Sequence, residues 1–204
     1  MDFQTKISRI ISAVFHPLLM PTYGVLVMFS SNTFFSLFTL KLKFIIFSII
    51  FLGTFLLPML FMPFFLYKKY IKKMEMKTRR ERILPLVITF ASFYLTYYYT
   101  NKLLPLPLIS RYLLAGTLSV AFSLIVTIYW KISLHLIGVG GLLALATALS
   151  FRFSADFRLF YISIFLLAGV VGFARLHLKS HTSLQVYTGF IAGFLIVFSI
   201  MFTF

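Results

Sequence analysis

The chain has 204 residues, of which 61% are hydrophobic, 19% aromatic and only 11% charged, and its mean hydropathy is +1.01. A soluble domain is usually about 45–50% apolar and about 25% charged. The composition therefore excludes an ordinary soluble enzyme, a disordered tail and a fibrous repeat. It predicts an integral membrane protein with several spans.

Apolar segments long enough to cross a bilayer recur along the whole chain. A helix needs about 20 apolar residues to cross the hydrocarbon core. The sequence predicts seven spans, at residues 9–30, 44–67, 84–101, 111–130, 132–151, 157–175 and 183–204. The fold class expected is all-α, a polytopic membrane bundle of about seven (six to seven) transmembrane helices. Because the connections are short, residues 1–204 are expected to form a single transmembrane domain.

The chain is strongly basic, with 19 Lys and Arg against 4 Asp and Glu. In a soluble protein this balance would favour nucleic acid as a partner. Here the cations stand in short segments between apolar runs, which favours membrane lipids with anionic headgroups, or phosphate ligands, over nucleic acid. Cysteine is absent, which excludes disulfides, a thiol nucleophile and thiolate metal sites.

Seven spans divide the connecting segments between two sides of the membrane. Side A, defined as the side of the N-terminus, carries 13 cations: Lys6, Arg9, Lys68, Lys69, Lys72, Lys73, Lys77, Arg79, Arg80, Arg82, Lys131, Arg175 and Lys179. Side B carries six: Lys41, Lys43, Lys102, Arg111, Arg152 and Arg158. Because Lys and Arg favour the cytoplasmic side, we expect the N-terminus and side A in the cytoplasm.

Three polar clusters interrupt the apolar sequence, and the alternation of spans puts all three on side A. Ionisable groups in a membrane are costly, so each cluster is a candidate functional site. The first runs from Lys77 to Pro85 and has two interpretations. It is either a basic loop that anchors the membrane face or a guanidinium clamp. In the clamp, Arg79 and Arg82 share a helical face and bind phosphate oxygens in bidentate fashion.

The second cluster, Lys131, Ser133 and His135, stands where the fifth span begins. A single histidine at a span end is often only an interfacial residue. Three polar residues at one helix N-terminus, however, favour an anion, because the first N–H groups of a helix have no helical partner.

The third cluster, residues 174–185, separates the sixth and seventh spans. His181 and Gln185 are four residues apart and therefore lie on one helical face. The amide oxygen of Gln185 can then accept a ring N–H from His181 and fix its tautomer. The alternative is a polar loop with a helix cap from Thr182 or Ser183.

Taken together, the clusters indicate phosphoryl chemistry. Histidine serves as a nucleophile or a proton donor near neutral pH, and arginine stabilises the charge on a transferring phosphoryl group. With four carboxylates, four histidines and no cysteine in the chain, a magnesium or zinc site is not expected. No other cofactor is expected either.

These residues resemble the type-2 phosphatidic acid phosphatase superfamily. Its third motif, Ser-Arg-x5-His-x3-Asp, is matched in spacing by Ala174, Arg175, His181 and Gln185. Its second, Pro-Ser-Gly-His, is matched at Ser133 and His135, with two spans between the motifs as in the family.

The resemblance covers about residues 70–195, a phosphatase-like core. The family's first motif, Lys-x6-Arg-Pro, is matched loosely by Arg82 and Pro85, and Glu75 stands where its Lys would fall. The sequence is also similar to divergent bacterial members that open with a His-Pro-Leu-Leu-Met-Pro-Thr-Tyr segment, here His16 to Tyr23. A bacterial-type inner membrane is the location implied.

The resemblance implies a metal-independent membrane phosphatase that acts on a lipid phosphate or pyrophosphate. Polyprenyl pyrophosphate and phosphatidic acid are the substrate types implied. His181 would be the nucleophile that forms a phosphohistidine, and His135 the acid that protonates the leaving oxygen. Arg175, Arg82 and Ser133 would hold phosphate oxygens.

Three positions depart from the family pattern. Gln185 replaces the Asp that orients and charges the nucleophilic histidine, Ala174 replaces a phosphate-binding Ser, and Leu134 replaces a Gly. Two alternatives therefore stand beside the phosphatase. One is a catalytically degenerate lipid-binding or lipid-transport protein of the same fold. The other is a small channel or structural membrane protein, in which Arg175, His181 and His135 are not coupled.

Overall fold

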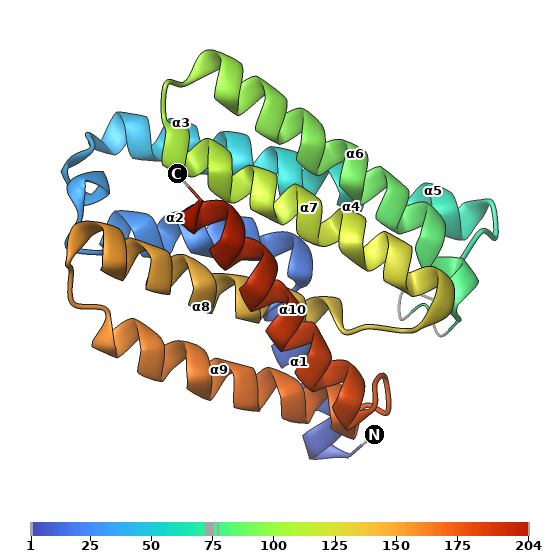
Figure 1. Ribbon diagram of the computed structural model, residues 1–204. Helices are drawn as coiled ribbons and strands as arrows, with labels where there is room; N and C mark the ends of the chain where they lie inside the picture. Colours follow the sequence, from blue (N-terminus) through green and yellow to red (C-terminus); the bar gives the residue numbers. More distant parts are fainter. Residues whose placement is uncertain (1, 72–75, 77, 204) are drawn as a thin grey trace.

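The computed structural model describes residues 2–71, 76 and 78–203, and within these ranges the chain folds into helices only (Figure 1). The helices are α1 (Phe3–Val14), α2 (Met20–Ser30), α3 (Leu40–Phe51), α4 (Leu57–Leu60), α5 (Met62–Tyr67), α6 (Arg79–Leu103), α7 (Pro107–Tyr129), α8 (Leu134–Phe153), α9 (Arg158–His177) and α10 (Ser183–Phe202). Short 3-10 turns η1 (Pro17–Leu19) and η2 (Phe34–Leu37) and a π-helical turn η3 (Leu52–Leu56) join some of them.

Seven helical segments of the described chain are long and apolar enough to cross a membrane. They are Phe3–Ser30, Leu40–Tyr67, Arg79–Leu103, Pro107–Tyr129, Leu134–Phe153, Arg158–His177 and Ser183–Phe202. The all-α polytopic bundle predicted from the sequence is therefore confirmed. The first span begins at Phe3 and not at residue 9, because an amphipathic turn precedes its apolar run.

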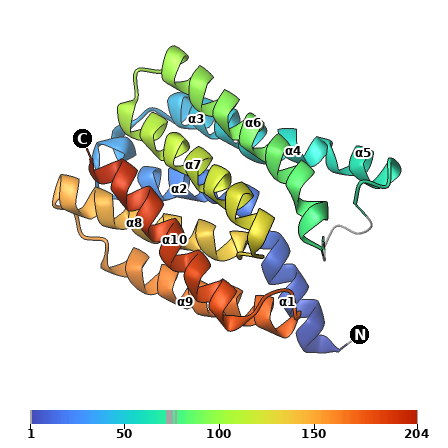
Figure 2. The same cartoon turned by 45° about the vertical axis from the view of Figure 1, so that its right-hand side comes forward.

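The connections gather at the two ends of the bundle, as the alternation of spans requires. In Figure 1 the N-terminus and the α7–α8 and α9–α10 connections lie toward the right-hand side, and Figure 2 shows the N-terminus again at the lower right. The C-terminus and the α6–α7 and α8–α9 connections lie at the opposite end. Helix α8 is central: most of its residues are buried, and it packs against α10, α9, α2 and α7. The side-A ends of several helices therefore surround the first turn of α8.

The first span is broken at a proline. Because Pro17 disfavours the helical region for the residue before it, His16 takes an extended backbone, with φ −64° and ψ 138°. The hydrogen bonds of α1 therefore stop at the Phe15 N–H, which donates to the Ile11 carbonyl. The carbonyl of Ser12 is left without a helical partner, and this carbonyl becomes part of the site described below.

Glycines bring α8 and α10 into backbone contact. A Cβ atom built on Gly140 would lie 2.1 Å from the carbonyl oxygen of Phe190, and one built on Gly193 would lie 2.0 Å from that of Ile137. Any larger side chain would separate the two helices. This close approach sets the spacing between the start of α8 and the α9–α10 turn, which carry His135 and His181.

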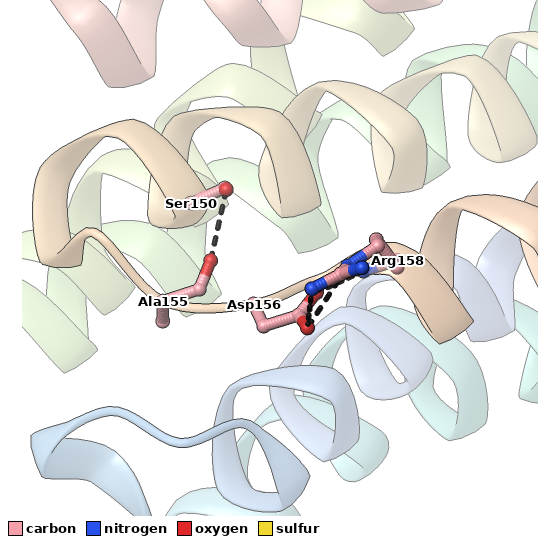
Figure 3. A network of polar contacts seen from close by, with 4 residues as sticks. All are labelled: Ser150, Ala155, Asp156 and Arg158. Carbon is pink, nitrogen blue, oxygen red and sulfur yellow. Dashed lines mark hydrogen bonds and ion pairs between the residues drawn. The ribbon is translucent and has the colours of Figure 1, made fainter.

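The α8–α9 connection on side B is held by a short polar network (Figure 3). The hydroxyl of Ser150 donates to the Ala155 carbonyl over 3.0 Å, and the Arg158 guanidinium pairs with the Asp156 carboxylate, Nη2 to Oδ2, over 3.0 Å. Hydrogen bonds from the Arg158 backbone and side chain lower the pKa of Asp156. This carboxylate thus lies at the opposite end of the bundle from the three predicted clusters.

Candidate functional site

A cavity of about 1130 Å³ opens among the side-A ends of the helices. The cations in its wall are Arg9, Arg82, Lys131, Arg175 and Lys179, and the described residues of the wall include no Asp or Glu. Such a surface attracts anions. The wall continues inward to Tyr112 on α7, 17 residues before the helix ends at Tyr129, which is a depth of about 25 Å at 1.5 Å per residue.

The deeper part of the wall is mainly apolar. It includes Met20, Phe93, Val120, Ile137 and Val197. The cavity is therefore cationic at one end and apolar at the other, which suits an amphiphile with an anionic headgroup.

Arg82 and His181 meet beside the cavity. Arg82, in the first turns of α6, places Nη2 3.4 Å from Nε2 of His181 and donates from Nη1 to the Ile132 carbonyl over 3.3 Å. Each of the two side chains is only 7% exposed. Arg82 and Lys131 line the cavity, whereas His181, which contacts both of them, does not.

The hydrogen bonds of Gln185 determine the tautomer of His181. The Thr182 N–H donates to Oε1 of Gln185 over 3.2 Å in a capping box at the start of α10, which fixes the orientation of the amide. Nδ1 of His181 lies 3.1 Å from this Oε1 and 3.2 Å from the Lys131 carbonyl. Since both are acceptors, Nδ1 carries the proton and Nε2 keeps its lone pair. The predicted bond and the alternative helix cap from Thr182 are both present.

Burial and the nearby positive charges keep His181 neutral. Burial is the largest cause, followed by Arg82 and Arg175, and together they lower the pKa of His181 to about 3, against a smaller opposite effect of the Gln185 hydrogen bond. At neutral pH the imidazole therefore presents an uncharged, nucleophilic Nε2.

The low pKa of His181 predicts a pH dependence of stability. The unfolded chain binds a proton on this histidine near pH 6.5, whereas the folded chain does so only near pH 3. The contribution of His181 to the free energy of unfolding is therefore full above pH 6.5 and is lost as the pH falls through the window from 6.5 to 3, by at most about 1.4 kcal/mol per pH unit.

Thermal unfolding of the purified chain at pH 7.5 and pH 5 measures this effect. We expect His181→Gln to lose less in Tm than the wild type between these two values, by a few degrees. Parallel losses in the two proteins would show that His181 does not titrate between the folded and unfolded states.

His135, at the start of α8, is the second histidine of the site. It lines the cavity, is 9% exposed, and donates from Nε2 to the Ser12 carbonyl over 3.1 Å. Its other ring nitrogen, Nδ1, is therefore the atom that carries the lone pair. The ring of His16 packs edge-on against it, with 5.9 Å between the centroids.

Arg175 and Ser133 complete the set predicted from the sequence. Arg175, in the last turn of α9, lines the cavity and donates from Nη1 to the Ser12 hydroxyl over 3.2 Å. Ser133 is the N-cap of α8 and is fully buried, and its Oγ has no hydrogen-bond partner among the described residues. Nε of Arg82 likewise has none among them. These two groups are therefore buried donors next to the cavity.

The structure brings together most of the predicted residues, but not all. Arg82, Arg175 and His135 line one cavity, while His181, Gln185 and Ser133 lie next to its wall and are not part of it. We define Arg82, His135, Arg175 and His181 as the histidine–arginine cluster.

Arg79 lies outside this site. Its Nη1 donates to the carbonyls of Ile128 and Tyr129 at the end of α7, so it caps that helix and does not face the cavity. Lys77, the first residue of the predicted cluster that contains Arg79, and Glu75, which stands where the first motif's Lys would fall, lie outside the described residues.

The contribution of the first span to the site is not predicted by the polar clusters of the sequence. Arg9, Ser12 and His16 all line the cavity, and Ser12 contacts both His135 and Arg175. The His16–Pro17 pair inside an apolar span was the available signal, since a histidine there is costly and a proline ends the helix.

Among the described residues, no group of three His, Cys, Asp or Glu side chains is placed to hold a metal ion. Comparison of the chain with models of protein families, with curated proteins and with solved structures finds no match. The proposal for function therefore stands on the geometry of the site.

Proposed function

We propose that this multi-pass membrane protein removes phosphate from a lipid phosphate or pyrophosphate, through a phosphohistidine on His181. The observation that carries the proposal is the state of His181. Two acceptors hold its Nδ1 proton, and Nε2 keeps a lone pair beside the Arg82 guanidinium. A neutral imidazole in contact with arginine, at the edge of a cationic cavity, is suited to attack a phosphoryl group.

In the proposed reaction, the phosphoryl group enters between Arg82 and His181 and takes over the guanidinium donors. Nε2 attacks phosphorus, an N–P bond forms, and the bond from phosphorus to the lipid oxygen breaks. His135 takes up a proton on Nδ1 when the anionic phosphate binds and gives that proton to the leaving oxygen, because its Nε2–H stays engaged by the Ser12 carbonyl. Water then attacks the phosphohistidine, and its proton returns to His135 while His181 is restored.

The dimensions of the cavity support a lipid as substrate. The cationic end would hold the headgroup, and the mainly apolar inner part of the wall, which reaches about 25 Å from the end of α7, would accept the hydrocarbon tail. We further propose that the chain is a divergent relative of the type-2 phosphatidic acid phosphatases in a bacterial-type inner membrane, with side A in the cytoplasm.

A lipid-binding or lipid-transport protein is the second candidate, and Gln185 is the observation that favours it. A neutral amide orients His181, but it stabilises an imidazolium less than a carboxylate does. A lipid phosphate would then bind the arginines without being cleaved.

Phosphate release by the purified chain in lipid nanodiscs separates the two candidates. We expect release from dioctanoyl phosphatidate or farnesyl pyrophosphate, and little from glycerol phosphate, which has no tail to occupy the apolar wall.

Gln185→Glu should raise turnover by about tenfold, because a charge-assisted hydrogen bond supports His181 as it becomes cationic.

Gln185→Asp tests the same charge on a shorter side chain, and Gln185→Leu removes the acceptor. A wild type without activity, together with carboxylate variants that gain none, would exclude the phosphatase in favour of the lipid-binding protein.

A further inference from the structure

Ser12, one of the residues of the first span that line the cavity, has two roles in the site. The hydroxyl of Ser12 accepts from Nη1 of Arg175 over 3.2 Å, and its carbonyl accepts from Nε2 of His135 over 3.1 Å. Ser12 is 9% exposed and lines the cavity. One residue of α1 therefore contacts two members of the histidine–arginine cluster, which come from two other helices.

The free carbonyl follows from the break in the span. In an uninterrupted helix, the carbonyl of Ser12 would accept from the N–H of residue 16. Pro17 forces His16 into an extended backbone, and the helical bonds end at Phe15. The carbonyl then bonds the imidazole of His135.

The same break also positions His16. Its Nδ1 accepts from the Leu18 N–H over 3.3 Å, and its ring packs edge-on against His135 and against Phe55, with centroid distances of 5.9 and 6.4 Å. The ring of His135 is therefore held at Nε2 by a hydrogen bond and on one side by an aromatic contact.

We propose that Ser12 is a positioning residue of the phosphate site, whose hydroxyl orients Arg175 and whose carbonyl, freed by the His16–Pro17 break, orients His135. The first span is thus part of the reaction centre, although it lies outside residues 70–195. This inference rests on the proposed function for its chemistry. The two hydrogen bonds of Ser12 on which it rests can, however, be tested without measuring turnover.

The hydroxyl is tested by titrating inorganic phosphate into the full chain in nanodiscs, with binding followed by ³¹P NMR. We expect Ser12→Ala to weaken phosphate binding by about tenfold, because Arg175 loses the bond that orients it. Ser12→Thr, which keeps a hydroxyl, should bind within about twofold of the wild type.

Ser8→Ala is the matched control. Ser8 lies one turn earlier on α1, is buried, and its hydroxyl has no partner among the described residues. Equal phosphate affinities for Ser12→Ala, Ser8→Ala and the wild type would overturn the role of the hydroxyl. A wild type that binds no phosphate would overturn it as well.

The carbonyl is tested through the tautomer of His135, measured by ¹⁵N NMR of histidine-labelled chain and assigned with His135→Gln. In the wild type we expect the proton on Nε2. In Pro17→Ala the helix can continue past residue 15, so that the His16 N–H donates to the Ser12 carbonyl. His135 then loses its acceptor, and its preference for the Nε2–H tautomer should be lost.

An unchanged ¹⁵N signal of His135 in folded Pro17→Ala would overturn the role of the carbonyl. If this variant does not fold, the phosphate affinities of the Ser12 variants decide the inference. Neither measurement requires hydrolysis. A chain that binds phosphate in a Ser12-dependent way but cleaves no lipid phosphate would therefore refute the proposed function and leave this inference standing.

Discussion

Replacing His181 with alanine is expected to abolish phosphate release from the lipid substrate, by at least about 1,000-fold in kcat. In the proposed reaction Nε2 of His181 is the atom that bonds to phosphorus. His135 has the other role in this reaction, which is to protonate the leaving oxygen from Nδ1 while its Nε2 is held by the Ser12 carbonyl. Loss of the nucleophile therefore removes the reaction path and not only part of the binding energy.

Two measurements check this result. One is phosphate release in nanodiscs, and the other is an acid-labile ³²P label trapped on denatured wild-type chain and absent from His181→Ala. Asp156→Asn is the control, because Asp156 lies on side B and pairs with Arg158, far from the cluster (Figure 3). Activity in His181→Ala within tenfold of the wild type would refute a phosphohistidine on this residue.

Gly193→Ala is expected to cause the largest loss of stability among single-methyl changes in α10. The new Cβ would stand 2.0 Å from the carbonyl oxygen of Ile137 and 2.7 Å from its Cα, and both are backbone atoms that cannot rotate away. Helices α8 and α10 must separate, which costs about 1–3 kcal/mol. At about 2–4 °C per kcal/mol, the Tm should fall by roughly 2–12 °C.

The matched control is Gly169→Ala on α9, where an added Cβ meets nothing within 4 Å. That variant should be as stable as the wild type or slightly more stable, since alanine favours the helix. Gly193→Ala should also weaken phosphate binding, because α8 carries His135 and α10 begins next to His181. Equal Tm values for the two alanine variants would show that the close contact of α8 with α10 is not required.

The spans were predictable because hydropathy is a local property. A run of about 20 apolar residues has few alternatives to a helix across the bilayer, and the predicted ranges agree with the observed ones to within six residues at each end. The alternation of the spans then requires Lys131, Arg175 and His181 to lie at one end of the bundle. The contact of His181 with Gln185 was predicted from their spacing of four residues, although His181 stands just before α10 and not on its helical face.

The sequence by itself thus determined the number of spans, the end of the bundle at which the polar clusters meet, and the tautomer-fixing partner of His181. Tertiary structure alone decided which of the clustered arginines face the cavity. Arg79 and Arg82 are three residues apart, yet one caps α7 and the other contacts His181. It also brought Ser12 to His135 and Arg175, 123 and 163 residues away in the chain. These outcomes depend on how the helices rotate and pack against one another, and no local pattern of residues encodes that packing.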